Sequence, residues 1–167
     1  RVAWVTSSPL TSTRPVFASR RGSTHGYDVV YHGSLNPELG GEAAFEALAE
    51  TCRAHGMGIV LDIVPNHMAV ATMDNPWWMD VLQSGPASPY ARYFDIDWTP
   101  ARTTLRDRLL VPALGEPLGA SIDGRRLSLH LQRERGAMVV RYGDLDLPLE
   151  PRTWRAALEA AFASLDV

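Results

Sequence analysis

The segment MGIVLDIVPNHMAV, residues 57–70, decides the fold. Its first half is β-branched and apolar on both faces, which predicts a parallel strand covered on both sides. The run breaks at Pro65, and Asn66 and His67 then follow the single carboxylate, Asp62, within a few residues. We therefore expect a buried strand whose carboxyl end presents an acid, an amide and an imidazole.

An amphipathic helix is predicted immediately before this strand. Between Pro37 and Gly56 the apolar side chains recur at helical spacing on one face, with charged side chains opposite. That apolar face consists of Phe45, Leu48, Ala49 and Cys52. Gly56 suits the left-handed conformation in which helices often end. A helix, a short turn and a buried strand make an α/β unit, so the expected fold class is α/β.

The rest of the chain divides into three further parts. Residues 1–24 keep no clean period and predict an irregular start with at most one strand, near Val16 and Phe17. The α/β unit lies within residues 25–70. Residues 71–150 begin with a segment rich in tryptophan and proline, which predicts short helices and loops around aromatic side chains.

Antiparallel strands and a last helix are predicted towards the end of the sequence. Asp123 and Gly124 are a strong signal for a tight turn, and leucines then alternate with polar residues from Leu127 to Leu131. This pattern predicts a small antiparallel β region. Residues 151–167 have apolar residues at helical spacing and predict an amphipathic helix.

Composition excludes several classes of protein. The chain has 167 residues, of which 46% are hydrophobic and 21% charged, as in soluble globular domains. The net charge is −3 and the basic residues are scattered, so neither nucleic acid nor a membrane surface is an expected partner. One cysteine, Cys52, allows no internal disulfide, and no apolar run is long enough to span a membrane. A reducing, cytoplasmic location is expected.

Two polar clusters are candidates for a functional site. Functional side chains gather at the carboxyl ends of parallel strands, where Asp62, Asn66 and His67 are expected. The simpler interpretation is that Asp62 binds backbone amides, Asn66 belongs to the turn after Pro65, and His67 is a semi-buried ring. The spacing leaves both interpretations open.

The second cluster is GSTHGYDVV, residues 22–30, which contains His25, Tyr27 and Asp28. Glycines around these side chains let the backbone approach a ligand closely. The alternative is a surface turn whose tyrosine packs on the helix. No two of the 5 histidines have the short spacing that zinc sites favour, so no metal and no cofactor are expected.

Five motifs in order carry a resemblance: GSTHGYDVV, NPELGG, DIVPNHMAV, DNPWW and GPASPYARYFDIDW. Together they resemble the maltooligosyl trehalose synthases, a branch of the α-amylase superfamily (glycoside hydrolase family 13), over the range from about Val16 to Leu149. The pattern DxVxNH is common to the superfamily, whereas the other motifs point to the trehalose-forming branch. The resemblance implies a partial (β/α)8 TIM barrel of the α-amylase type, with a small antiparallel insertion rich in aromatic residues.

The resemblance also implies a function in carbohydrate metabolism. Such enzymes convert malto-oligosaccharides to maltooligosyl trehalose by intramolecular transglucosylation, an isomerase reaction of trehalose biosynthesis that needs no cofactor. The implied substrate-binding residues are Tyr27, Asp28, His67 and His25, and the implied loop-shaping residues are Asp62 and Asn66. A tyrosine ring is a suitable platform for the apolar C–H face of a pyranose.

No residue of this chain is expected to be catalytic. Retaining chemistry needs two carboxyl groups about 5 Å apart. In the superfamily they come from barrel strands four and five, and no segment resembling those strands follows in this sequence. A closed barrel takes about 250 residues. We therefore expect an inactive fragment, unless the remainder of the barrel is encoded separately. Residues 1–14 do not continue the family pattern, and Arg21 and Tyr31 depart from it, as expected for a truncated or frameshifted gene.

Three alternatives remain open. The chain could derive from an α-amylase-type hydrolase. It could be a non-enzymatic carbohydrate-binding remnant, using Tyr27, His67 and the tryptophans; the relevant tryptophans are Trp77, Trp78 and Trp98. Finally, a half barrel with exposed strand edges between Ile59 and Val64 would be prone to aggregation.

Overall fold

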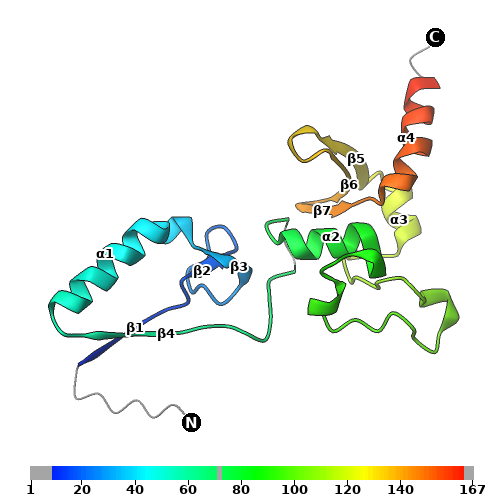
Figure 1. Ribbon diagram of the computed structural model, residues 1–167. Helices are drawn as coiled ribbons and strands as arrows, with labels where there is room; N and C mark the ends of the chain where they lie inside the picture. Colours follow the sequence, from blue (N-terminus) through cyan, green and yellow to red (C-terminus); the bar gives the residue numbers. More distant parts are fainter. Residues whose placement is uncertain (1–8, 71–72, 164–167) are drawn as a thin grey trace. The chain divides into compact units, whose positions relative to one another are not determined.

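The computed structural model describes residues 9–70 and 73–163, which form two compact units (Figure 1). The first unit ends at Val70, and the second comprises the residues after it. In neither described range is a helix long and apolar enough to cross a membrane.

The first unit is an α/β unit interrupted by a hairpin. Its elements are β1 (Leu10–Thr13), β2 (Phe17–Ser19), β3 (Val29–Leu35), the 3-10 turn η1 (Pro37–Leu39), α1 (Gly41–Ala54) and β4 (Gly58–Leu61). Strands β1 and β4 pair in parallel, with Leu10 opposite Gly58 and Thr13 opposite Leu61. Strands β2 and β3 form a separate antiparallel pair. The connection from β1 to β4 contains α1, as a parallel pair requires.

The predicted helix is present, with a 3-10 turn at its start. The Oδ1 atom of Asn36 accepts a hydrogen bond from the backbone N–H of Glu38 at 2.9 Å and so caps η1. The least exposed side chains of α1 include Phe45, Ala49 and the buried Cys52, as predicted, whereas Leu48 of the predicted face is exposed. Gly56, with φ 64°, provides the predicted left-handed stop.

The predicted burial of the first-unit strand is wrong for this chain. Strand β4 forms, but Val60 is 48% exposed and Leu61 is also exposed. Among the described residues β4 has a single strand neighbour, β1, and one packed helix, α1. A strand with one neighbour and one helix cannot bury both of its faces.

Of the start predicted for residues 1–24, the strand near Val16 and Phe17 is present as β2, but a second strand precedes it. Residues 10–13, with the sequence LTST, form β1, and β2 begins at Phe17. A short serine- and threonine-containing segment gives little local signal for a strand. It becomes one because the edge of β4, which lies far along the chain, supplies its hydrogen-bonding partners. Residues 1–8 lie outside the described residues.

The second unit combines short helices with a three-stranded antiparallel sheet. Its helices are α2 (Pro76–Ser84), α3 (Leu118–Asp123) and α4 (Pro151–Ala163), its strands are β5 (Leu127–Gln132), β6 (Ala137–Tyr142) and β7 (Leu145–Pro148), and its 3-10 turns are η2 (Gly85–Ala87), η3 (Ala91–Tyr93), η4 (Thr103–Leu105) and η5 (Arg133–Arg135). The strand order is β5-β6-β7.

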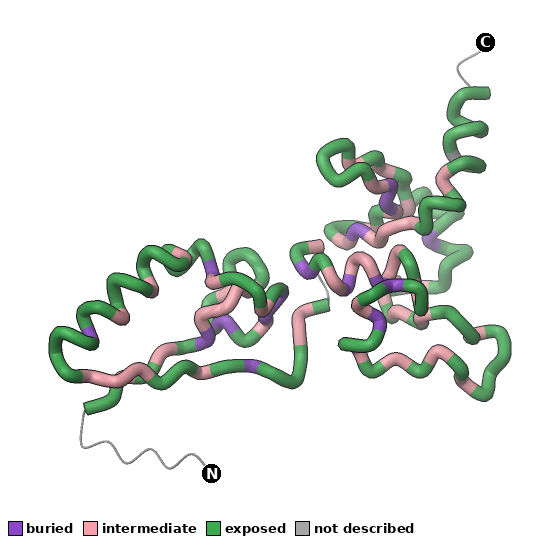
Figure 2. The backbone as a smooth tube through the Cα atoms, in the orientation of Figure 1, coloured by how far each residue is buried: buried purple, intermediate pink, exposed green. Residues whose placement is uncertain are grey.

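A small core supports this unit. Asn75 is fully buried and its Oδ1 caps α2 by accepting from the N–H of Trp78 at 3.0 Å. Trp78 packs against Phe94 with ring centroids 5.2 Å apart. Buried segments of this unit include parts of α2 and of the central strand β6 (Figure 2). Val139 of β6 is fully buried.

One local prediction for the second unit is corrected, and one is confirmed. Asp123 and Gly124 do not form a hairpin turn, because Asp123 ends α3 and the N–H of Gly124 donates to the carbonyl of Ala120. The predicted antiparallel β region is present as β5, β6 and β7, and Leu129 and Leu131 of β5 do not face inward but are exposed. The polar side of β5 is turned inward instead, where Gln132 donates to the buried Asp146 at 3.0 Å.

The last predicted helix is α4, which ends at Ala163; residues 164–167 lie outside the described residues. Trp154 is half-buried and its Nε1 donates to the carbonyl of Leu149. Leu158 and Phe162, on the predicted apolar face, are exposed.

Candidate functional site

The six predicted site residues lie in the first unit and come from two loops. The β2–β3 loop carries His25, Tyr27 and Asp28, and the segment after β4 carries Asp62, Asn66 and His67.

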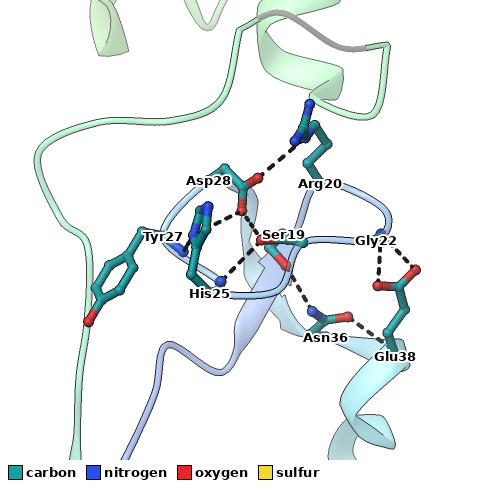
Figure 3. Close-up of polar contacts among 10 residues, drawn as sticks. Ser19, Arg20, Gly22, His25, Tyr27, Asp28, Asn36 and Glu38 are labelled. Carbon is teal, nitrogen blue, oxygen red and sulfur yellow. Dashed lines mark hydrogen bonds and ion pairs between the residues drawn. The ribbon is translucent and has the colours of Figure 1, made fainter.

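The β2–β3 loop is closed by hydrogen bonds around Asp28 (Figure 3). The hydroxyl of Ser23 donates to Oδ1 of Asp28, and the N–H of Gly26 donates to the Ser23 hydroxyl at 3.1 Å. Arg20 holds the other side of the carboxylate, with its Nε 3.3 Å from Oδ2. The N–H of Arg20 also donates to the carbonyl of Asp28 at 3.0 Å. These contacts set the shape of the loop.

The same contacts tune the charge of Asp28. Burial acts to raise the pKa of its carboxyl group, but the hydrogen bond from Ser23, the backbone N–H of Asp28 itself and the charges of His25 and Arg20 outweigh it. The net effect lowers the pKa of Asp28 below its ordinary value. Asp28 is therefore an ionised, half-buried acceptor at neutral pH.

Gly26 is needed at its position for two reasons. Its φ of 79° lies in the left-handed region, where side chains are strained. A Cβ atom there would lie 2.9 Å from the backbone carbonyl oxygen of Pro15, which is itself buried. The loop can therefore pack against the connection between β1 and β2 only with glycine at this point.

Further contacts anchor the loop to η1. The N–H of Gly22 donates to both carboxylate oxygens of Glu38, at 3.1 and 3.0 Å. Asn36, which caps η1, donates from Nδ2 to the hydroxyl of Ser19 at 2.8 Å. Figure 3 shows these two contacts on the side of the loop opposite Tyr27. The beginning of the loop is thus fixed to the start of η1.

Tyr27 joins the two loops. Its ring points away from the Asp28 contacts, and its Oη donates to Oδ2 of Asp62 at 2.6 Å (Figure 3 shows the ring). The hydrogen bond to Asp62, followed by the negative charge of that carboxylate, raises the pKa of Tyr27 above its ordinary value of 10.0. The ring of His25 stacks beside Tyr27 with centroids 5.9 Å apart, and Tyr27 remains 44% exposed. An exposed aromatic ring is therefore held by its hydroxyl group.

The segment after β4 is tied to β3 at two points. Nε2 of His32 lies 2.9 Å from the carbonyl oxygen of Val64, and the N–H of Ala69 donates to the carbonyl of Val29 at 2.8 Å. Between these points Asn66 and His67 are exposed, and Asn66 Oδ1 lies 3.1 Å from Nδ1 of His67. The imidazole of His67 is therefore positioned by a local contact and is open to solvent.

Sequence reasoning missed the residues that hold these loops. Ser23 could have been recognised, because a hydroxyl three residues before a glycine often closes a turn. The other residues that hold the loops bind partners farther along the sequence, and no local pattern indicates this. They are Arg20, His32 and Glu38. Among the described residues no group of three or more histidine, cysteine or acidic side chains is suited to a metal ion.

The first unit thus presents an exposed tyrosine ring whose hydroxyl group is bound by Asp62, with exposed imidazoles on the same two loops. Comparison with known proteins identifies its family. The sequence model of the α-amylase catalytic domain matches residues 11–113. The chain belongs to the α-amylase family. The match begins within β1, so part of the segment expected to be unrelated lies inside the family region.

Within the α-amylase family, the chain resembles the trehalose-forming branch. It is 40% identical over 139 residues to a putative maltooligosyl trehalose synthase of Mycobacterium tuberculosis, covering 82% of this chain and 16% of that protein. It is 33% identical over 99 residues to an intracellular maltogenic amylase of Bacillus subtilis, covering 59% of this chain and 16% of that protein. The chain thus spans about a sixth of the length of these relatives.

Solved structures agree with the sequence comparison. A crystal structure of a maltooligosyl trehalose synthase superposes with a TM-score of 0.73 at 38% identity, covering 84% of this chain and 18% of that one. The enzyme from Arthrobacter ramosus superposes with a TM-score of 0.72 at 35% identity, covering 86% of this chain and 17% of that one. The resemblance predicted from the motifs is confirmed, and the fold is a partial α/β fold of this family.

Proposed function

We propose that this chain forms part of the TIM barrel of a maltooligosyl trehalose synthase, with residues 71–150 as its insertion, and that its first unit holds a malto-oligosaccharide substrate. The observation that carries this proposal is the hydrogen bond between Tyr27 and Asp62. It unites the two family motifs into one surface and leaves the ring of Tyr27 open to a ligand. The 40% identity to a putative enzyme of this kind supports the reaction.

Each site residue has a role that its contacts support. The hydroxyl of Tyr27 is engaged by Asp62, so Tyr27 offers its ring face to a pyranose. His25 stacks beside that ring, and its exposed imidazole, like the exposed imidazole of His67, can hydrogen-bond sugar hydroxyl groups. Asp28 accepts from Ser23 and Arg20, yet a carboxylate has about four acceptor positions, so it can also accept from a hydroxyl.

Asp62 and Asn66 act on the loop rather than on the substrate. Asp62 orients Tyr27, and Asn66 orients His67. Neither Asp28 nor Asp62 is assigned to bond breaking, because each is engaged in holding a loop. We infer that the reacting carboxyl groups come from barrel strands outside this chain. Incubation of the purified chain with maltopentaose should then leave the concentration of reducing ends unchanged.

Two alternatives are less well supported. A hydrolase origin fits less well, because the maltogenic amylase is less similar to this chain than the putative trehalose synthase. A remnant that binds sugar through its tryptophans conflicts with their packing, since Trp78 is buried and Trp77 stacks on Tyr90 and Tyr93. A cytoplasmic location is part of the proposal, and the buried, unpaired Cys52 is compatible with it.

A chimera tests the proposal. Residues 9–149 replace the corresponding segment of the Mycobacterium tuberculosis relative, and turnover of maltopentaose is followed through reducing ends. The proposal expects a folded chimera whose reducing ends fall without release of glucose. Tyr27→Ala should lower kcat/KM by about tenfold or more, whereas Tyr27→Phe, which keeps the ring, should lower it much less. Rising reducing ends, or equal activity of the Tyr27→Ala chimera, would contradict the proposal.

A further inference from the structure

The segment after β4 carries three residues of the candidate site but has no regular structure of its own. Residues 62–70 belong to neither a helix nor a strand, and Asp62, Asn66 and His67 all lie in this range. The backbone of such a segment keeps its position only through bonds to neighbouring elements. The element that supplies these bonds is β3.

His32 of β3 binds the middle of this segment. Its Nε2 lies 2.9 Å from the carbonyl oxygen of Val64. Val64 is 5% exposed, so its carbonyl oxygen needs a partner within the protein rather than water. Because Val64 lies between Asp62 and Asn66, this bond fixes the backbone at the centre of the site residues.

The bond also determines which ring nitrogen of His32 carries a proton. A carbonyl oxygen only accepts, so Nε2 must donate and must carry a hydrogen atom. A neutral imidazole has one ring proton, which leaves Nδ1 without one. A protonated imidazole also has an N–H group at Nε2. The bond to Val64 can therefore form in both charge states of the ring.

Packing limits the orientation of the His32 ring. The ring lies against Phe17 of β2, with centroids 5.9 Å apart and an angle of 55° between the ring planes. His32 is half-buried and follows the buried Val30 by two positions, so both lie on the same face of β3. The N–H group of His32 is thus held in the direction of Val64 without a ligand.

Asp62 connects the bond of His32 to Tyr27. Two positions separate Asp62 from Val64, and Oδ2 of Asp62 accepts from Oη of Tyr27 at 2.6 Å. Hydrogen bonds between oxygen atoms need distances of about 2.5–3.0 Å. A small displacement of the backbone at Val64 is therefore enough to break the contact between the two loops. His67, three positions after Val64, would be displaced as well.

We propose that His32 is a positioning residue of the candidate site: its Nε2–H group holds the carbonyl of Val64 and so sets the places of Asp62 and His67. The use of this surface for a malto-oligosaccharide rests on the proposed function. The contacts that lead from His32 to Tyr27 need no ligand, so the two ideas can be tested separately.

Three substitutions separate the N–H group from the bulk of the ring. His32→Gln places an amide nitrogen where Nε2 lies, so it keeps the donor. The amide of His32→Asn is one atom shorter and does not reach Val64. His32→Leu keeps an apolar contact with Phe17 and has no donor. Ser34→Ala, at an exposed position of the same strand, is the control.

The phenolate absorbance of Tyr27 reports the contact with Asp62. It is obtained in each variant as the difference from the same chain with Tyr27→Phe. The midpoint should fall towards 10.0 in His32→Asn and His32→Leu, because Asp62 no longer binds the phenol, and should stay raised in His32→Gln and Ser34→Ala. Melting temperatures of all variants distinguish a displaced segment from an unfolded chain.

Two further measurements complete the test. Nitrogen-15 spectra of the imidazoles should show neutral His32 protonated at Nε2. Methyl-labelled Met68, which follows His67 directly, reports binding of maltotriose. His32→Leu should weaken this binding by about three- to tenfold, the effect of one hydrogen bond, and His32→Gln should restore it.

The outcomes distinguish His32 from the proposed function. An unchanged Tyr27 midpoint in His32→Leu, an equal fall in His32→Gln, or a ring proton at Nδ1 of neutral His32 would each overturn the role of His32. Midpoints as expected, combined with a Met68 signal that maltotriose does not shift, would support the role of His32 and contradict the proposed function.

Discussion

The two units of the molecule differ in how far they bury similar apolar residues. In the second unit Val81 and Val139 are buried by the aromatic residues around α2 and by the sheet. In the first unit Val60 and Ile63, which belong to the apolar run from Met57 to Val64, are exposed. The second unit therefore carries a small core of its own. The first unit has the geometry of a binding site but leaves much of its apolar strand uncovered.

The largest expected effect is on the free energy of unfolding, and it is tested by truncating one buried and one exposed valine. Val139→Ala should lower the free energy of unfolding by about 2 kcal/mol, because it removes two buried methyl groups and leaves a cavity. Val60→Ala, the matched control on exposed β4, should change it by no more than about 0.5 kcal/mol. Urea unfolding followed by circular dichroism measures both. An equal loss for Val60→Ala would mean that β4 is covered in solution, and the contrast between the units would disappear.

The next prediction concerns the loop that carries the candidate site. Gly26→Ala should destabilise the first unit by about 1–3 kcal/mol, because the left-handed backbone is strained and the new Cβ meets the carbonyl of Pro15. Gly22→Ala is the control: its φ is 73°, but a Cβ there meets nothing within 4 Å, so it should cost less. Amide hydrogen exchange in β2 and β3 reports the change. Equal effects of the two variants would show that the contact with Pro15 does not destabilise the Gly26→Ala chain.

A smaller effect concerns how the stability of the second unit depends on pH in acid, through the carboxylate of Asp146. The hydrogen bond from Arg141 lowers the pKa of Asp146 below its ordinary value of 3.8. Its stabilising contribution is therefore complete above pH 3.8 and is lost as the pH falls through the lower folded pKa. Asp146→Asn should make the stability of the second unit less dependent on pH in this range, whereas Asp144→Asn should not. Tryptophan fluorescence during acid titration measures this, since Trp77, Trp78, Trp98 and Trp154 belong to this unit.

The smallest effect is local to Tyr27. Its raised pKa means that the neutral phenol stabilises the first unit below pH 10.0, and that this contribution is lost as the pH rises through the higher folded pKa. The phenolate absorbance of Tyr27, obtained as the difference between wild type and Tyr27→Phe, should therefore titrate above pH 10.0. Asp62→Asn should bring the midpoint down, because it removes the carboxylate that accepts the bond. An unchanged midpoint would show that the two loops are not joined in solution.

Much of the local structure could be predicted from the sequence, because it rests on short-range patterns. The periodicity of residues 37–56 predicted the helix and its buried face, and Gly56 predicted its end. The strand from Gly58 was predicted by its β-branched residues, although its burial was not, because burial depends on neighbouring elements that no local pattern contains. Strand β1 was missed for the same reason, since its hydrogen-bonding partner lies far along the chain.

The sequence by itself determined the family, the helix and the strand that follow one another within residues 37–64, and the residue types of the candidate site, but it missed β3. The tertiary structure alone decided which of these residues meet. Tyr27 and Asp62 are 35 positions apart, and only the packing of β3 beside the segment after β4 brings the phenol to the carboxylate. Likewise, the orientation of Gln132 depends on Arg141 through Asp146, across paired strands. Hydrogen bonds act over a few ångströms, so contacts between distant segments exist only once the chain has folded.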